Sequence, residues 1–340
     1  MAIKVAINGF GRIGRTLFRA AKLRNADFDF VAINDRADAF SLSTVLKYDS
    51  IHGIYGGEVS YDNDNIIVDG IKIPIYSFRE EEGNLPWGDL GVDVVVESTG
   101  IARDKDFLNF HLESGAKKVL LTTPGKEPVD ATVVFGVNHD ILTGDEKIIL
   151  NASGTTNSAA VLCKVMEDSF TIKEGFIITV HAYTLDQSLL DYPHEDMRRA
   201  RSAALSIIPT TTWAVQMVEQ IIPRLKGKLD GIAYRVPVPA GSIVDLSLDL
   251  ATGVTLEEIQ TVMKEAANGY MKGVLKYEES PLVSADIVGD THSAIYDANL
   301  TKVLKPDFVK IVGWFDNEAG YCNRAVDLIK LISSDMKKPH

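Results

Sequence analysis

Cysteine and long apolar runs are both scarce in this chain of 340 residues. Only Cys163 and Cys322 are present, which is too few for a disulfide framework or a zinc cluster. No apolar run approaches the roughly 20 residues that span a bilayer. The start, Met1 to Lys4, leads directly into an apolar run rather than a signal peptide. We therefore expect a cytoplasmic protein with no membrane partner and no metal site.

Positive charge is also in short supply. The 35 lysines and arginines are outnumbered by 47 acidic residues, which gives a formal net charge of -12. Proteins that bind nucleic acid non-specifically need basic surface to neutralise phosphates, so we expect no nucleic-acid partner. Apolar residues, in contrast, make up 46% of the chain, enough to fill the cores of two ordinary domains.

Short apolar runs indicate the architecture of the first domain. The run Ile3 to Asn8 is followed by a glycine-rich turn, an amphipathic segment to about Leu23, and a second run from Phe30 to Asn34. This order is that of a βαβ unit. The pattern predicts an α/β fold with a Rossmann-type doubly wound parallel sheet over residues 1–151. Further buried strands are expected at Val92 to Glu97, Lys118 to Leu121 and Ile148 to Asn151.

Longer strand patterns begin after residue 175. The runs Phe176 to Tyr183, Ile232 to Val238 and Ile243 to Leu250 predict a second, α+β domain over residues 152–317, with a mixed, largely antiparallel sheet. Residues 318–340 should form a C-terminal helix that packs back on the first domain. Asp316 and Asn317 are placed to cap the start of that helix.

The first strand-to-helix turn carries Gly9, Gly11 and Gly14. This spacing permits a tight turn and a close approach of backbone N–H groups to a pyrophosphate, although a purely structural turn is the alternative. Asp35, at the end of the second run, would accept hydrogen bonds from ribose hydroxyls and repel a 2′-phosphate, which favours NAD over NADP. Arg36 leaves NADP open, because its guanidinium could pair with that phosphate; the alternative is a solvated surface arginine.

Six motifs, in order along essentially the whole chain, resemble those of the glyceraldehyde-3-phosphate dehydrogenase family. Members of that family attack an aldehyde with a cysteine thiolate, pass hydride to NAD and release the thioester to inorganic phosphate. The resemblance therefore implies a small phosphorylated aldehyde and phosphate as partners. It also implies a homotetramer, in which residues from about 185 to 206 reach toward a neighbour's cofactor site. The motifs are Ala6–Arg15, Leu46–Ser50, Glu97–Gly100, His181–Thr184, Arg198–Arg201 and Asp316–Glu318.

The resemblance also assigns site residues. His181 would act as the acid/base, and the planar forks of Arg199 and Arg235 would bind phosphate oxygens together with Thr184. The alternative is that His181 has a purely structural role and that the arginines form surface ion pairs. Hydroxyl donors are expected from Ser153, Thr155 and Thr212. The cofactor residues implied are Asn8, Gly9, Gly11, Arg12, Ile13, Gly14, Asp35, Arg79, Thr123 and Asn317.

Three positions depart from the family pattern. The family's nucleophile lies in a Ser-Cys-Thr-Thr-Asn segment, but Gly154 stands at the cysteine position here, and glycine has no side chain with which to attack. Trp213 follows Thr212 where the family has glycine at a phosphate subsite, and Ala319 stands where tryptophan is common. Together they indicate either unrelated drift or a pocket reshaped for another ligand, by nature or by engineering. Both cysteines are expected to be packed helix residues.

Three functions fit these patterns. The first is a glyceraldehyde-3-phosphate dehydrogenase without its thiol, which binds NAD but hardly turns over. The second is a pseudoenzyme that uses the cofactor and anion sites without chemistry. The third is an oxidoreductase that acts on a larger aldehyde or alcohol through His181 without a covalent intermediate.

Overall fold

The computed structural model describes residues 2–78, 85–101 and 103–335. The chain divides into two compact units. Unit 1 holds Met1–Val133, His139–Ala152 and Cys322–His340, and unit 2 holds Val134–Asn138 and Ser153–Tyr321. None of the helices in the described ranges is long and apolar enough to cross a membrane. Which unit serves the cofactor and which the substrate stays a prediction at this point.

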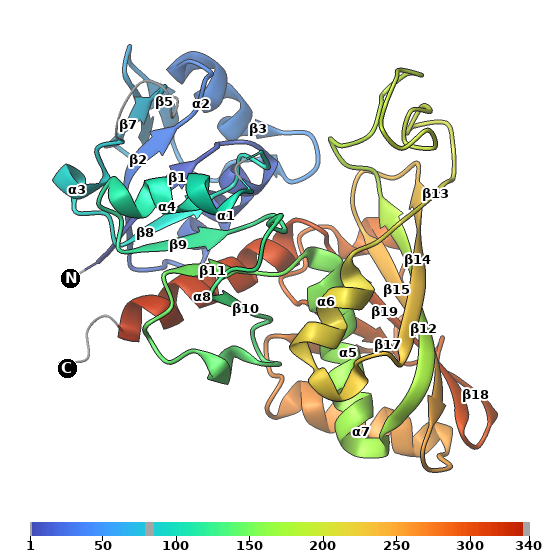
Figure 1. The fold of residues 1–340 in the computed structure, drawn as a ribbon. Coiled ribbons are helices and arrows are strands. Elements are labelled where there is room, and N and C mark those ends of the chain that lie inside the picture. The colour runs from blue at the N-terminus through green and yellow to red at the C-terminus, as the bar shows by residue number, and fades with distance from the viewer. Residues whose placement is uncertain (1, 79–84, 102, 336–340) are drawn as a thin grey trace. The chain divides into compact units, whose positions relative to one another are not determined.

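Unit 1 is built on a sheet whose described strands follow the order β10-β11-β9-β8-β1-β2-β7-β6-β5 (Figure 1). The neighbours from β10 to β7 pair in parallel, and β6 and β5 extend the sheet antiparallel. Because the chain adds strands on both sides of β1, the sheet is doubly wound, which confirms the predicted fold. The strands are β1 (Ile3–Asn8), β2 (Phe28–Asn34), β5 (Val59–Tyr61), β6 (Asn65–Val68), β7 (Ile71–Tyr76), β8 (Val94–Glu97), β9 (Lys118–Leu121), β10 (Ala131–Thr132) and β11 (Ile148–Leu150); β3 (Tyr48–Asp49) and β4 (Gly53–Ile54) form a separate hairpin.

The central strands of unit 1 are buried along their length, as parallel strands covered on both faces should be. All four residues of β8 are buried, and Val95 packs in one cluster with Ala6, Ala32 and Trp87. Each of these side chains comes from a different element, so the cluster joins the two halves of the sheet. The described helices of unit 1 that precede the last helix of the chain are α1 (Arg12–Leu23), α2 (Ala39–Lys47), α3 (Trp87–Leu90), α4 (Lys105–Glu113) and the short η2 (His139–Ile141).

The last helix, α8 (Ala319–Asp335), begins where the sequence predicted a cap. The Asp316 carboxylate accepts hydrogen bonds from the backbone N–H groups of Glu318 and Ala319, which the first turn of a helix leaves unpaired. From residue 322 onward α8 belongs to unit 1. There Arg24, at the end of α1, forms an ion pair of 2.5 Å with Asp327.

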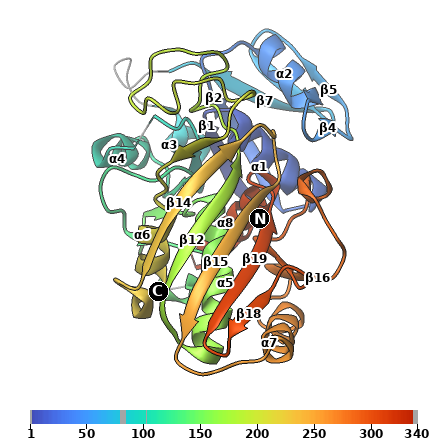
Figure 2. The same ribbon diagram turned by 90° about the vertical axis from the view of Figure 1, so that its right-hand side faces the viewer.

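Unit 2 contains a mixed sheet in the order β13-β14-β12-β15-β19-β17-β16, with β18 beside β19. Figure 2 shows β14, β12, β15 and β19 side by side. The pairs β12–β14 and β16–β17 are parallel and the others antiparallel, as predicted. The strands are β12 (Ile172–Ala182), β13 (Ile208–Thr210), β14 (Leu229–Val236), β15 (Ser242–Leu250), β16 (Leu275–Glu278), β17 (Ala294–Asp297), β18 (Lys302–Lys305) and β19 (Phe308–Phe315).

One face of this sheet is covered by helix α5 (Gly154–Phe170). Strand β15 alternates strictly between buried and half-buried residues, the pattern of a strand with one covered face. Most of α5 is buried, and it packs against β12, β15, β17 and β19. The remaining helices of unit 2 are α6 (Ala214–Ile221), α7 (Leu256–Asn268), η3 (Pro223–Leu225) and η4 (Ser284–Ile287).

Candidate nucleotide and anion sites

The turn between β1 and α1 requires two of its three glycines. Gly9 has a φ of +89°, and a Cβ there would lie 2.7 Å from the backbone nitrogen of Thr99. A Cβ on Gly14 would lie 2.4 Å from the carbonyl oxygen of Gly9, so α1 could not approach β1 as closely. At Gly11 no atom lies within 4 Å of the added Cβ. This glycine therefore leaves open space at the start of α1, which is where a helix N-terminus attracts phosphate.

A pocket of about 430 Å³ lies beside this turn within unit 1. Asp35 stands in its wall, and its carboxylate accepts hydrogen bonds from the backbone N–H groups of Phe10 (2.7 Å) and Ala37 (3.0 Å), which fix its position. Arg36 is exposed and makes no ion pair among the described residues. These features fit a dinucleotide whose ribose meets Asp35. The lining comprises Asn8, Gly9, Gly11, Asn34, Asp35, Arg36, Phe78, Leu85, Ser98, Thr99, Ile101, Phe107 and Phe110.

Five other described residues expected to contact the cofactor lie outside that lining: Arg12, Ile13, Gly14, Thr123 and Asn317. Arg12 forms an ion pair of 2.7 Å with Asp49. Burial opposes the charge on Asp49, but the backbone N–H groups of His52 and Ile51, together with Arg12, lower the pKa of the carboxyl to about 2. Ile13 is half-buried in the first turn of α1, and Thr123 follows β9. Arg79 lies outside the described residues.

In unit 2, Gly154 is the first residue of α5. Ser153 caps the helix: its hydroxyl accepts a hydrogen bond from the backbone N–H of Thr156 at 3.1 Å. A Cβ on Gly154 would lie 3.4 Å from the carbonyl oxygen of Asn317 and 3.7 Å from the ring of Phe315, which are ordinary contacts. The backbone therefore accommodates a side chain at this position.

His181 lies near the end of β12, packed edge-on against the same Phe315 ring at a centroid distance of 5.8 Å. Burial, and then the neighbouring charge of Arg235, lower the pKa of His181 to about 3, so the ring is neutral at neutral pH. Its Nδ1 lies 2.6 Å from the carbonyl oxygen of Ala182. A carbonyl only accepts, so this contact requires the proton on Nδ1 and leaves the lone pair on Nε2. Nη1 of Arg235, 3.3 Å from the same Nδ1, then donates to Ala182 and Thr184 rather than to the ring.

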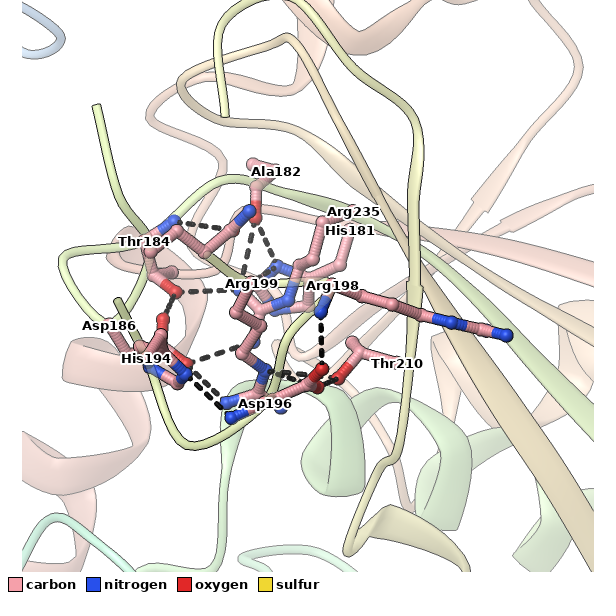
Figure 3. A network of polar contacts seen from close by, with 11 residues as sticks. His181, Ala182, Thr184, Asp186, His194, Asp196, Arg198, Arg199, Thr210 and Arg235 are labelled. Atoms are coloured by element: carbon pink, nitrogen blue, oxygen red, sulfur yellow. Dashed lines mark hydrogen bonds and ion pairs between the residues drawn. The ribbon is translucent and has the colours of Figure 1, made fainter. Parts of the chain in front are cut away.

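Three of the side chains expected to bind anions, those of Thr184, Arg199 and Arg235, come together (Figure 3). Register places Arg235 of β14 directly beside His181 of β12. Its Nη1 donates to the Thr184 hydroxyl at 2.6 Å and to the Ala182 carbonyl at 3.2 Å. Arg199 reaches the same place from the segment after β12. In Figure 3 the side chain of the neighbouring Arg198 points away from this network.

Comparison with known proteins finds a family match within each unit. Residues 3–105 match the model described as "Glyceraldehyde 3-phosphate dehydrogenase, NAD binding domain", and residues 153–317 match that of the C-terminal domain of the same enzyme. The chain belongs to the glyceraldehyde-3-phosphate dehydrogenase family. It is 49% identical to "Glyceraldehyde-3-phosphate dehydrogenase" of Mycolicibacterium smegmatis, over 99% of this chain and 100% of the relative. It is 51% identical to that of Geobacillus stearothermophilus, over 98% and 99%.

Membership of the glyceraldehyde-3-phosphate dehydrogenase family makes this chain an NAD-dependent dehydrogenase by ancestry, with NAD as its cofactor. Asn317, one of the expected cofactor residues, is half-buried beside Gly154, and its side-chain oxygen accepts a hydrogen bond from Ser242 at 3.5 Å. Ser242 also accepts a hydrogen bond from the backbone N–H of Ala182. Ser242 thus links the strand of His181 to Asn317, a connection that no sequence motif indicated.

The departures from the glyceraldehyde-3-phosphate dehydrogenase pattern have different surroundings. Trp213 is the residue before α6, and its side chain is 74% exposed, so the indole fills no cavity within this chain. The hydroxyl of Thr212 accepts from the backbone N–H of Ala214, and Thr155 is buried in the first turn of α5. Ala319 is buried at the start of α8. The structure gives no reason for Trp213.

Neither cysteine offers a substitute nucleophile. Cys163 is fully buried within α5, and this burial raises the pKa of its thiol to about 12, so the reactive thiolate is not available at neutral pH. Cys322 is also fully buried, and its Sγ lies 3.6 Å from the carbonyl oxygen of Ile13.

A buried polar chain beside the nucleotide pocket was missed by sequence reasoning. Glu97, at the end of β8, is 1% exposed, yet it accepts hydrogen bonds from Asn8 (2.5 Å), from His111 (3.2 Å) and from Thr99. The indole of Trp87 donates to the other nitrogen of His111. The carboxylate is thus satisfied without water, and it fixes Asn8 and Thr99 in the pocket wall. Glu97 lies in a family motif, but no sequence pattern around His111 or Trp87 predicts their contact with it.

Proposed function

We propose that this chain binds NAD and a small phosphorylated aldehyde or a related anion, and that it has lost the covalent, phosphorylating reaction. The observation that carries the proposal is Gly154 at the start of α5, beside the ring that His181 contacts. The likeness of Ser153–Asn157 to the family's Ser-Cys-Thr-Thr-Asn segment supports the view that a cysteine has been replaced. With no thiol there, no covalent adduct with the aldehyde forms.

The chemistry explains why the loss should be severe. A hydrated aldehyde is a poor hydride donor, whereas the alkoxide of a thiohemiacetal expels hydride readily and leaves an activated acyl group for phosphate. NAD, when bound, accepts the hydride. Nε2 of His181 can still take a proton from a bound hydroxyl, but general base catalysis of this kind contributes only about 10²–10⁴-fold. Proton transfer by His181 therefore does not replace the missing thiol.

The decisive experiment follows NAD reduction with glyceraldehyde 3-phosphate and phosphate, for this chain and its Gly154→Cys variant. The variant should gain at least about 10³-fold in rate, because the site accepts a Cβ and a helix N-terminus lowers the pKa of a thiol. Gly154→Ala is the matched control, since it adds the same Cβ without sulfur and should stay inactive. Equal inactivity of all three proteins, each shown to bind NAD, would count against the proposal.

A different oxidoreductase is the second candidate. The lone pair on Nε2 of His181 favours it, because a base at this position needs no thiol to accept a proton from an alcohol or an aldehyde hydrate. NAD reduction by the unaltered chain with a larger, non-phosphorylated substrate would support it. A pseudoenzyme would instead bind NAD and phosphate and gain nothing from Gly154→Cys.

The location, oligomeric state, pathway and cofactor preference that we propose are those that the family resemblance implies. We propose a cytoplasmic homotetramer in glycolysis by ancestry, with NAD preferred and NADP admitted if Arg36 pairs with a 2′-phosphate. The fixed carboxylate of Asp35 supports the preference for NAD.

A further inference from the structure

We propose that the Asp186 carboxylate is an internal counter-ion that occupies the arginine site and competes with the incoming anion. The inference rests on the proposed function, because it concerns the same anion-binding side chains. Asp186 follows β12 by four residues, and its side chain is 43% exposed.

Three of the side chains expected to hold the anion, those of Thr184, Arg199 and Arg235, face this one carboxylate (Figure 3). The Thr184 hydroxyl donates to Oδ1, and Nη1 of Arg199 donates to Oδ2 at 2.7 Å. Nη2 of Arg235 lies 4.0 Å from the same Oδ2. Two carboxylate oxygens thus meet donors from two guanidinium groups and a hydroxyl, much as phosphate oxygens would. Asp186 satisfies the donors that a bound anion would need.

The charges of the cluster are already balanced. The two arginines carry two positive charges, and Asp186 and Asp196 carry two negative ones. Asp196 lies 3.5 Å from Arg199 and accepts a hydrogen bond from Thr210, which in turn accepts from Arg199. Burial opposes ionisation of Asp186, but Arg235, Thr184 and Arg199 hold its pKa below the ordinary value. A dianion entering this neutral cluster therefore meets the repulsion of a charged Asp186.

The difference in burial between Arg235 and Asp186 determines which side chain moves when an anion binds. The Arg235 side chain is only 15% exposed and is anchored on Ala182 and Thr184. Asp186 is far more accessible, so its carboxylate can turn into solvent without becoming a buried, unpaired charge. The anion thus displaces the aspartate and keeps the arginines. Asp186 lowers the affinity for dianions more than for monoanions, because the repulsion scales with ligand charge.

The test is a titration of the whole chain with inorganic phosphate at mildly alkaline pH, where phosphate is a dianion. Asp186→Asn keeps the shape and an acceptor oxygen but removes the charge, and it should bind phosphate roughly tenfold more tightly. Nitrate, a monoanion, should gain less, a difference that a purely structural role would not produce. Asp191→Asn is the matched control: this aspartate lies in the same segment, pairs with Arg201 at 2.8 Å and makes no contact with Arg199 or Arg235. Its affinity for phosphate should not change.

Weaker or unchanged phosphate binding by Asp186→Asn would overturn the inference, because the aspartate would then position the arginines rather than compete. Arg235→Gln separates this failure from that of the proposed function. If Arg235→Gln weakens phosphate binding, the anion site stands whatever Asp186 does. If Arg235→Gln leaves binding unchanged in a protein with the parent melting temperature, the proposed anion site itself is wrong.

Discussion

His181 makes the stability of the protein depend on pH. Its pKa is lowered to about 3 in the folded chain, against an ordinary value near 6.5. Between these values the unfolded chain binds a proton on this residue that the folded chain does not. The free energy of unfolding should therefore fall as pH drops through this window, by at most about 1.4 kcal/mol per pH unit. Above the ordinary pKa near 6.5, His181 is neutral in both the folded and the unfolded chain, and this loss of stability is absent.

Urea unfolding across this pH range checks the expectation. His181→Gln has no titrating group and should show a shallower decline of stability with falling pH than the parent chain. Its stability near neutral pH reports the separate cost of lost packing against Phe315. Identical pH slopes in the two proteins would show that His181 is protonated equally in both states.

Individual residues show what the sequence could and could not predict at this scale. Its motif singled out His181 as a candidate acid/base, and the structure places it beside Arg235. Neither cause of its lowered pKa was predictable: burial, the larger one, depends on packing between elements, and Arg235 is its neighbour only through the parallel register of β12 and β14. Asp186 was missed for a similar reason: its role depends on two arginines that are distant in sequence.

The turn between β1 and α1 separates the folding role of glycine from its binding role. Gly14→Ala should destabilise the chain by roughly 1–3 kcal/mol, because the new Cβ would lie 2.4 Å from the backbone of Gly9. Gly11→Ala meets no protein atom and should change stability by less than about 1 kcal/mol. It should nevertheless weaken NAD binding by roughly tenfold or more, because a methyl group there blocks the approach of a pyrophosphate.

Chemical denaturation and NAD titration of both variants test this separation. Gly11→Ala is the control for Gly14→Ala in denaturation, since each adds one methyl group to the same turn. Unaltered NAD affinity in Gly11→Ala would place the pyrophosphate elsewhere.

Local signals predicted the elements of this fold better than their lengths. The β1 turn and the Asp316 cap of α8 depend on neighbouring residues, so the sequence located both. Strand β12, in contrast, begins at Ile172 rather than at Phe176. It extends because β15 and β14 supply backbone partners over its length, which composition does not reveal. The α/β class and both sheet types were predicted, since each follows from the period of apolar residues.

For the whole molecule, the proposed homotetramer makes a prediction about the segment after β12. This segment exposes several large apolar side chains, among them Leu185, Leu189, Leu190, Met197 and Leu205, which a monomer would leave in water. A charge placed among them should weaken association, because an interface core excludes unpaired charges. Leu189→Glu should therefore sediment at a lower mass than the parent chain at the same micromolar concentration.

Leu304→Glu is the matched control for this prediction. Leu304, on β18, is 76% exposed, as is Leu189, but it stands between half-buried Val303 and an exposed lysine rather than in a run of exposed apolar residues. The control should keep the parent mass, which separates loss of an interface from a general effect of added charge. A parent chain that sediments as a monomer would overturn the tetramer. Equal dissociation of both variants would reflect a general effect of added charge, and it would remove this support for an interface at residues 185–206 and for the reach of this segment toward a neighbouring cofactor site.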